Sequence, residues 1–340
     1  MEQQADRRIG FIDLTKGLCI MLVVMMHVGG AFDGLAARPV LSSFTMPLYF
    51  FVSGLFFKSY EGFGGFLARK VDKLLVPFLI FYLGSFLLMY GISKAVPGTF
   101  RLPVRWSELL LVFRGHELIR FNPPIWFLVA LFNCNILFYL VHYLRRKHIP
   151  TMFVVTLLIG AAGFWLGKRR IELPFYIDVA MTALPFYFAG FWIRRYNFFL
   201  FPHHRFDKLI PLFILLALVT MYFTATPLGM RTNNYPGNFV QVYLAAFAGI
   251  FAIMLLCKKV KKAPVVTYLG RFSVITLGIH GPLLFFLRPL VSHFLHNEWV
   301  QSIVLLLLTL GVCLLLTPLI VRMIPQFAAQ KLLAKSGSRE

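Results

Sequence analysis

The chain has 340 residues, of which 59% are hydrophobic and only 14% are charged, and its mean hydropathy is +0.76. This composition excludes a soluble domain of this size, and recurring runs of about 20 apolar residues predict an all-α protein that crosses a membrane many times. The net charge of +21 lies mainly at the ends of the apolar runs, which favours contact with membrane lipids over a role in binding nucleic acid.

The pattern of apolar runs predicts about ten transmembrane helices joined by short connections. We therefore expect residues 1–340 to form a single membrane-embedded domain with no soluble domain. The second and fifth helices are short and either tilted or re-entrant, and Pro282 predicts a kink or break in the ninth. The predicted helices cover residues 11–31, 40–57, 74–93, 124–144, 150–167, 176–194, 209–226, 238–257, 265–290 and 299–322.

The distribution of lysine and arginine predicts the orientation of these helices. An even number of spans places both termini on one side of the membrane. With the termini inside, the inner segments carry 21 of the 34 basic residues and the outer segments carry 11. Because inner loops are enriched in basic residues, we expect cytoplasmic termini and a location in the inner (cytoplasmic) membrane.

Three ionisable residues share one face of the first predicted helix. At 100° per residue, Lys16 lies about 20° from His27 around the helix axis, and Asp13 lies about 40° away on the other side. His27 is about 16 Å beyond Lys16 along the axis. Ionisable groups in a membrane-spanning helix are costly and usually face a cavity, so these three residues are the candidate catalytic group. The alternative is that His27 has only a structural role as a hydrogen-bonding partner.

A second histidine, His280, lies at a similar depth in the ninth helix. The two imidazoles face one cavity if the two helices meet there; the alternative is that His280 only packs between helices. Lys70 and Lys73 are three residues apart at the start of the third helix and share a face. They serve either as a positive-inside anchor or as a phosphate clamp for a cytosolic cofactor.

The loop between residues 94 and 123 is the longest connection and carries five basic residues, including Arg120. It either contacts phospholipid headgroups or forms a basic wall for an anionic or lipid-linked acceptor. The sequence contains no nucleophile elbow, P-loop, HExxH or EF-hand pattern, and we expect no metal site. Its four cysteines all lie in apolar runs and read as buried small residues.

Several motifs in this order and spacing resemble acyltransferase family 3, in particular its fucose-4-O-acetylase-like branch. They begin with the helix-one pattern that runs from Phe11 through Lys16 to His27. The pattern Met46-Pro-Leu-Tyr-Phe-Phe-Val-Ser53-Gly54 follows. Further similar segments are the basic run that ends at Pro77, residues 125–132, residues 173–190, and Leu269 to Ser273 followed by His280. Many members of the family carry arginine where this chain has Lys16, and lysine lacks the bidentate fork of arginine.

The resemblance implies transfer of an acetyl or other acyl group from cytosolic acetyl-CoA to a hydroxyl of a cell-envelope or surface glycan or lipid-linked sugar. On this interpretation His27 is the general base, with an acetyl-enzyme intermediate left open. Lys70, Lys73 and Ser53 would bind the donor, with Lys16 as a further contact to its phosphates. Trp126, His280 and Arg120 are the candidate substrate-binding residues, and Asp13 is expected to pair with Lys16 or another basic group.

Two other classes of function share some of these features. A transporter or flippase for a lipid-linked saccharide would also use intramembrane charges and a basic vestibule. Such a protein often has an inverted repeat, and none is visible here. A non-catalytic assembly partner in an envelope polysaccharide complex would tolerate substitution of His27.

Overall fold

The computed structural model describes residues 10–60, 62–96, 104–113, 121–145, 148–196, 208–209, 211–216, 229–235, 237–260 and 263–324. Eleven α-helices and several short 3₁₀ segments account for most of these residues, and the described part contains no β-sheet. The helices are α1 Gly10–Val28, α2 Arg38–Leu55, α3 Phe63–Lys70, α4 Val76–Ala95, α5 Trp126–Arg145, α6 Ile149–Lys168, α7 Ile177–Tyr196, α9 Phe239–Lys259, α10 Pro264–Arg271, α11 Ser273–Phe294 and α12 Glu298–Met323.

Eight helical segments among the described residues are long and apolar enough to cross a membrane. The predicted all-helical, multi-pass fold is therefore confirmed. The prediction of about ten spans is only partly met. The second predicted helix forms as α2 but is not among the eight. The seventh, 209–226, is described only at residues 209 and 211–216, of which 211–216 are helical.

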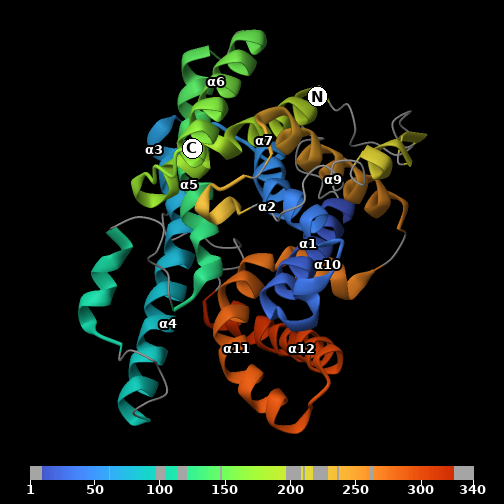
Figure 1. The fold of residues 1–340 in the computed structure, drawn as a ribbon. Helices are drawn as coiled ribbons and strands as arrows, with labels where there is room; N and C mark the ends of the chain where they lie inside the picture. Colours follow the sequence, from blue (N-terminus) through green and yellow to red (C-terminus); the bar gives the residue numbers. More distant parts are fainter. Residues whose placement is uncertain are drawn as a thin grey trace.

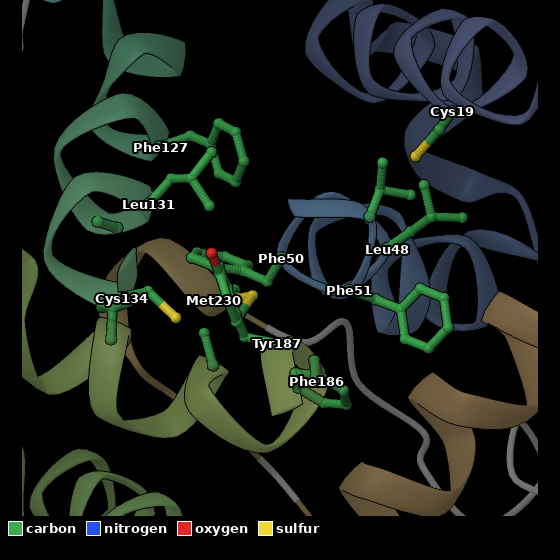
Figure 2. Packing of buried hydrophobic residues seen from close by; sticks show 14 of the residues in the cluster. Cys19, Leu48, Phe50, Phe51, Phe127, Leu131, Cys134, Phe186, Tyr187 and Met230 are labelled. Carbon is green, nitrogen blue, oxygen red and sulfur yellow. The ribbon is translucent and has the colours of Figure 1, made fainter. Parts of the chain in front are cut away.

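The centre of the protein is formed by α1, α2, α5, α7 and α9, with α11 packed against α12 at one end (Figure 1). Figure 2 shows aromatic side chains from α2, α5 and α7 filling the space between these helices. The rings of Phe50 and Phe127 lie 5.1 Å apart, and those of Phe138 and Tyr187 lie 4.7 Å apart. All four cysteines are buried and free, as predicted.

The end of the first helix and the start of the third differ from the prediction. The first helix ends at Val28, three residues early, because Gly29 and Gly30 adopt left-handed backbone angles with φ of 68° and 59°. The third begins at Phe63, and a π-helical turn over Val71–Leu75 joins α3 to α4. This turn precedes Pro77, whose ring is incompatible with a regular α-helical bond to the preceding turn.

The predicted ninth helix is broken at Phe272, ten residues before the expected position at Pro282. Phe272 has φ of −111° and separates α10 from α11. Pro282 lies inside a continuous α11. A proline cannot donate to the carbonyl four residues earlier, here that of Gly278. Asn122 Nδ2 donates to this carbonyl at 2.6 Å, so its hydrogen bond is restored from another segment.

Candidate functional site

The two histidines predicted to face one cavity lie side by side. The imidazole rings of His27 in α1 and His280 in α11 have centroids 5.0 Å apart and an angle of 69° between their planes. His280 is fully buried, whereas His27 is exposed. The structure therefore brings together two side chains that are separated by more than 250 residues in the sequence.

Both imidazoles are oriented by their own helices. His27 Nδ1 donates to the carbonyl of Val23 at 2.8 Å, and His280 Nδ1 donates to the carbonyl of Thr276 at 2.8 Å. Because a carbonyl oxygen only accepts, each neutral ring carries its proton on Nδ1 and keeps a lone pair on Nε2. His280 Nε2 is buried and has no hydrogen-bond partner among the described residues. The Nε2 atom of His27 is thus available as a proton acceptor.

The His27 side chain opens into a cavity of about 370 Å³. The cavity is formed where α1 ends, between α4, α11 and the segment that precedes α5. Its lining is mainly apolar, with two ionisable side chains, those of His27 and Arg288. The lining residues are His27, Met89, Val104, Phe121, Pro123, Pro124, Gly281, Leu284, Phe285 and Arg288.

Arg288 joins α11 to the end of α1. Its Nη2 donates to the carbonyl oxygens of His27 at 2.7 Å and Val28 at 3.1 Å, which are the last two residues of α1. The last carbonyls of a helix lack partners within the helix and attract positive charge, so this contact stabilises the helix end. It also fixes the backbone of His27 relative to α11, which carries His280.

Asn122, the residue before the cavity-lining Pro123, supports the same region. Its side chain is fully buried, and Nδ2 donates to Ser85 Oγ at 3.0 Å as well as to Gly278. The Oδ1 atom has no hydrogen-bond partner among the described residues. We name the group formed by His27, His280, Asn122 and Arg288 the histidine end of the protein.

Lys16, Lys70 and Lys73 lie away from the histidine end and are named the lysine end. Tyr49 of α2 donates to the carbonyl of Lys16 at 2.9 Å. Ser53, one turn further along α2, accepts from Asn135 Nδ2 at 3.5 Å. The Lys70 ammonium acts electrostatically on Cys134, the residue next to Asn135, and on Lys73. Lys16 is therefore bonded to α2 and Ser53 to α5, whereas Lys70 and Lys73 are related to this region by charge interactions alone.

A buried polar network joins α2, α5 and α7 beside the lysine end. Tyr187 donates to Asn135 Oδ1 at 2.7 Å, and Asn135 Nδ2 also donates to the carbonyl of Leu131 at 2.7 Å. Sequence reasoning missed Asn135 and Tyr187. The signal was present, because an asparagine inside an apolar span is costly unless it has a partner.

Asp13 and Lys16 form an ion pair at 2.9 Å, as predicted. They do not reach His27, which lies near the opposite end of α1. Asp13 instead lines a separate cavity of about 650 Å³ together with Arg271. Trp126 is buried against Tyr176, with ring centroids 5.6 Å apart, and does not line the His27 cavity. Arg120 lies outside the described residues.

Comparison with known protein families decides the class of protein. The sequence model of the acyltransferase 3 family, described as an acyltransferase domain, matches residues 9–318. The chain belongs to the acyltransferase 3 family. No curated protein and no solved structure matched it. The family match spans both the lysine end and the histidine end, and it identifies the protein as a multi-pass membrane acyltransferase.

Proposed function

We propose that this acyltransferase moves an acetyl group from cytosolic acetyl-CoA to a hydroxyl group of a cell-envelope glycan, with His27 as the general base. The observation that carries the proposal is the His27 imidazole. Its Nδ1 proton is held by Val23, and its side chain opens into a cavity of about 370 Å³. A base in this state accepts a proton at Nε2 from a hydroxyl group in the cavity.

The chemical step transfers the acyl group from the thioester sulfur of acetyl-CoA to the hydroxyl oxygen of the acceptor. The acceptor oxygen attacks the thioester carbonyl, His27 Nε2 takes the hydroxyl proton, and the carbon–sulfur bond breaks as the new carbon–oxygen bond forms. The proton then leaves His27 for the released thiolate. His280, packed against His27, acts as a positioning residue that limits the orientations of the catalytic ring.

The lysine end has the charge expected of a phosphate-binding site for the donor. Lys73 interacts electrostatically with Arg69 and Lys58, in addition to Lys70. Clustered cations are stabilising when they face phosphate oxygens, because charge-assisted hydrogen bonds are stronger than neutral ones. We place this end at the cytoplasmic face and the histidine end toward the outside, in agreement with the bias in basic residues.

The branch of the family, the acceptor and the location are parts of the same proposal. The motif order favours the fucose-4-O-acetylase-like branch and therefore a sugar acceptor. The proposal places the protein in the cytoplasmic membrane with both termini inside. The transporter hypothesis explains neither the match to an acyltransferase family nor a histidine held in one tautomer. The transfer reaction explains both and is therefore the better explanation of the site.

The test is release of free thiol from acetyl-CoA by the purified protein in detergent, with an envelope glycan extract as acceptor. We expect His27→Ala to reduce the rate by roughly 10²–10⁴-fold, the usual contribution of a positioned general base. The matched control is His293→Ala, because His293 is an exposed histidine near the end of α11 that does not line the cavity. An unchanged rate in His27→Ala would contradict the assignment.

A further inference from the structure

Arginines from three different elements act on His27 at the end of α1. Electrostatic interactions reach His27 from Arg38 at the start of α2, from Arg231 in the 3₁₀ segment Met230–Thr232, and from Arg288 in α11. Such a group is unusual beside a residue that must accept a proton. A group of positive charges at this position suggests that an anion binds beside His27.

Only one of the three guanidinium groups is neutralised by a carboxylate among the described residues. Arg38 forms an ion pair with Asp33, and its Nη2 lies 3.4 Å from the carbonyl of Met26. Neither Arg231 nor Arg288 makes an ion pair with a described residue. Glu298 is exposed at the start of α12 and lies close to Gly30. Glu172 and Asp178 act electrostatically on Tyr176, as Arg231 does, but neither forms an ion pair with Arg231 or Arg288.

Arg288 has unused donors at the cavity. A guanidinium group carries five N–H donors, and the two bonds to the end of α1 use those of Nη2. The three N–H groups on Nε and Nη1 make no hydrogen bond to a described residue. Arg288 is exposed and lines the same cavity as His27. These donors are therefore accessible to a molecule in the cavity.

Arg231 provides a second positive charge that acts on His27, although its side chain does not line the cavity. It is exposed and also acts electrostatically on Tyr176, which precedes α7. No hydrogen bond holds its guanidinium group against another described residue. Arg288 lines the cavity and Arg231 adds positive charge at His27, so together they favour the binding of carboxylate or phosphate oxygens there.

We propose that Arg288 and Arg231 form an anion-binding subsite for the acceptor, which therefore carries a carboxylate or phosphate group near the hydroxyl that is acylated. This inference rests on the proposed function, because it names the chemical class of its acceptor. The subsite positions the acceptor by its negative group while His27 Nε2 faces the hydroxyl. A neutral sugar would leave both arginines without a partner.

The first measurement uses inorganic phosphate as the probe and requires no turnover. The protein is placed in nanodiscs of phosphatidylcholine with saturating coenzyme A, which occupies the proposed phosphate-binding site at the lysine end. Its thermal midpoint is then compared in phosphate and in chloride of equal ionic strength. We expect phosphate to raise the midpoint of the wild type, and Arg231→Gln and Arg288→Gln to weaken phosphate binding about tenfold or more. The control Arg169→Gln, an exposed arginine stacked on Trp165, should respond like the wild type.

Arg231→Gln keeps the test valid if Arg288→Gln loosens the end of α1, because Arg231 has no bond to that helix. Absence of a phosphate effect, or an equal effect in both variants and wild type, would overturn the subsite. In nanodiscs that contain phosphatidylglycerol, the wild-type response to phosphate should persist. Its loss would assign the arginines to a lipid headgroup and overturn their role in acceptor binding.

The second measurement identifies the acceptor class. Envelope glycans are separated by anion exchange into neutral and anionic fractions, and each is offered with labelled acetyl-CoA. We expect the label in the anionic fraction, with an acceptor KM that rises about tenfold in Arg231→Gln. Labelling of the neutral fraction alone would refute the inference. Failure of the proposed function would look different, since the wild type would then release no thiol from acetyl-CoA with either fraction.

Discussion

The hydrogen bond from Asn122 to the Gly278 carbonyl yields a specific prediction. Pro282 leaves this carbonyl without its usual helical donor, and Asn122 supplies one. Pro282 cannot donate to the Gly278 carbonyl, and Asn122 Nδ2 does so at 2.6 Å. Replacing Asn122 with alanine leaves this buried carbonyl without a donor. The cost of an unsatisfied buried carbonyl is about 1–3 kcal/mol.

The double-mutant cycle isolates this cost. Asn122→Ala also removes the bond to Ser85 and the unpartnered Oδ1, but these effects are the same in any background. In a Pro282→Ala background, residue 282 has an N–H that bonds to the Gly278 carbonyl. We therefore expect Asn122→Ala to cost about 1–3 kcal/mol less there than in the wild type.

Unfolding in mixed detergent micelles, followed by circular dichroism, measures the four free energies. Pro318→Ala is the matched control, because Pro318 also lies inside a long helix, α12. The Asn122 side chain donates to Ser85 and Gly278, and neither residue belongs to α12. The costs of Asn122→Ala and Pro318→Ala should add. Equal costs of Asn122→Ala with and without Pro282 would refute the reasoning.

Three further predictions test the site and the packing that supports it. A Cβ at Gly17 would overlap the backbone carbonyl of Val266, so Gly17→Ala should lower the free energy of unfolding by about 1–3 kcal/mol. The control is Gly311→Ala, where the added methyl group enters open space and should raise the free energy of unfolding by up to about 1 kcal/mol. Steady-state kinetics of Lys70→Gln should show about a tenfold higher KM for acetyl-CoA with little change in kcat. Replacing His280 with leucine should lower kcat by about tenfold or more while the KM for acetyl-CoA stays constant, and an equal change in both would contradict a positioning role.

The sequence predicted the parts of the fold that depend on local composition. Long apolar runs define spans on their own, and the periodicity of α1 placed Asp13 near Lys16 closely enough to predict their ion pair. Depth along each helix also predicted that His27 and His280 lie at one level. Whether their faces meet depends on the crossing of α1 and α11, which no single helix encodes.

The errors arose where a distant residue changes the outcome of a local rule. Pro282 is a helix breaker by local chemistry, yet α11 continues because Asn122 supplies the missing donor. The true break at Phe272 has no proline or glycine at the break itself. The sequence does not reveal the role of Arg288, because its target, the last turn of α1, is 260 residues away along the chain.

The lysine end and the histidine end have different tasks in the proposed reaction. Lys16 and His27 are both on α1 and lie about 16 Å apart along its axis. Since α1 is a continuous helix, the donor must span this distance with its own flexible arm rather than by a hinge in α1. Substitutions at the lysine end should therefore alter donor binding, and those at the histidine end should alter chemistry and acceptor choice. Arg288 serves both roles at the histidine end, because its Nη2 holds the backbone of His27 while the side chain also lines the cavity.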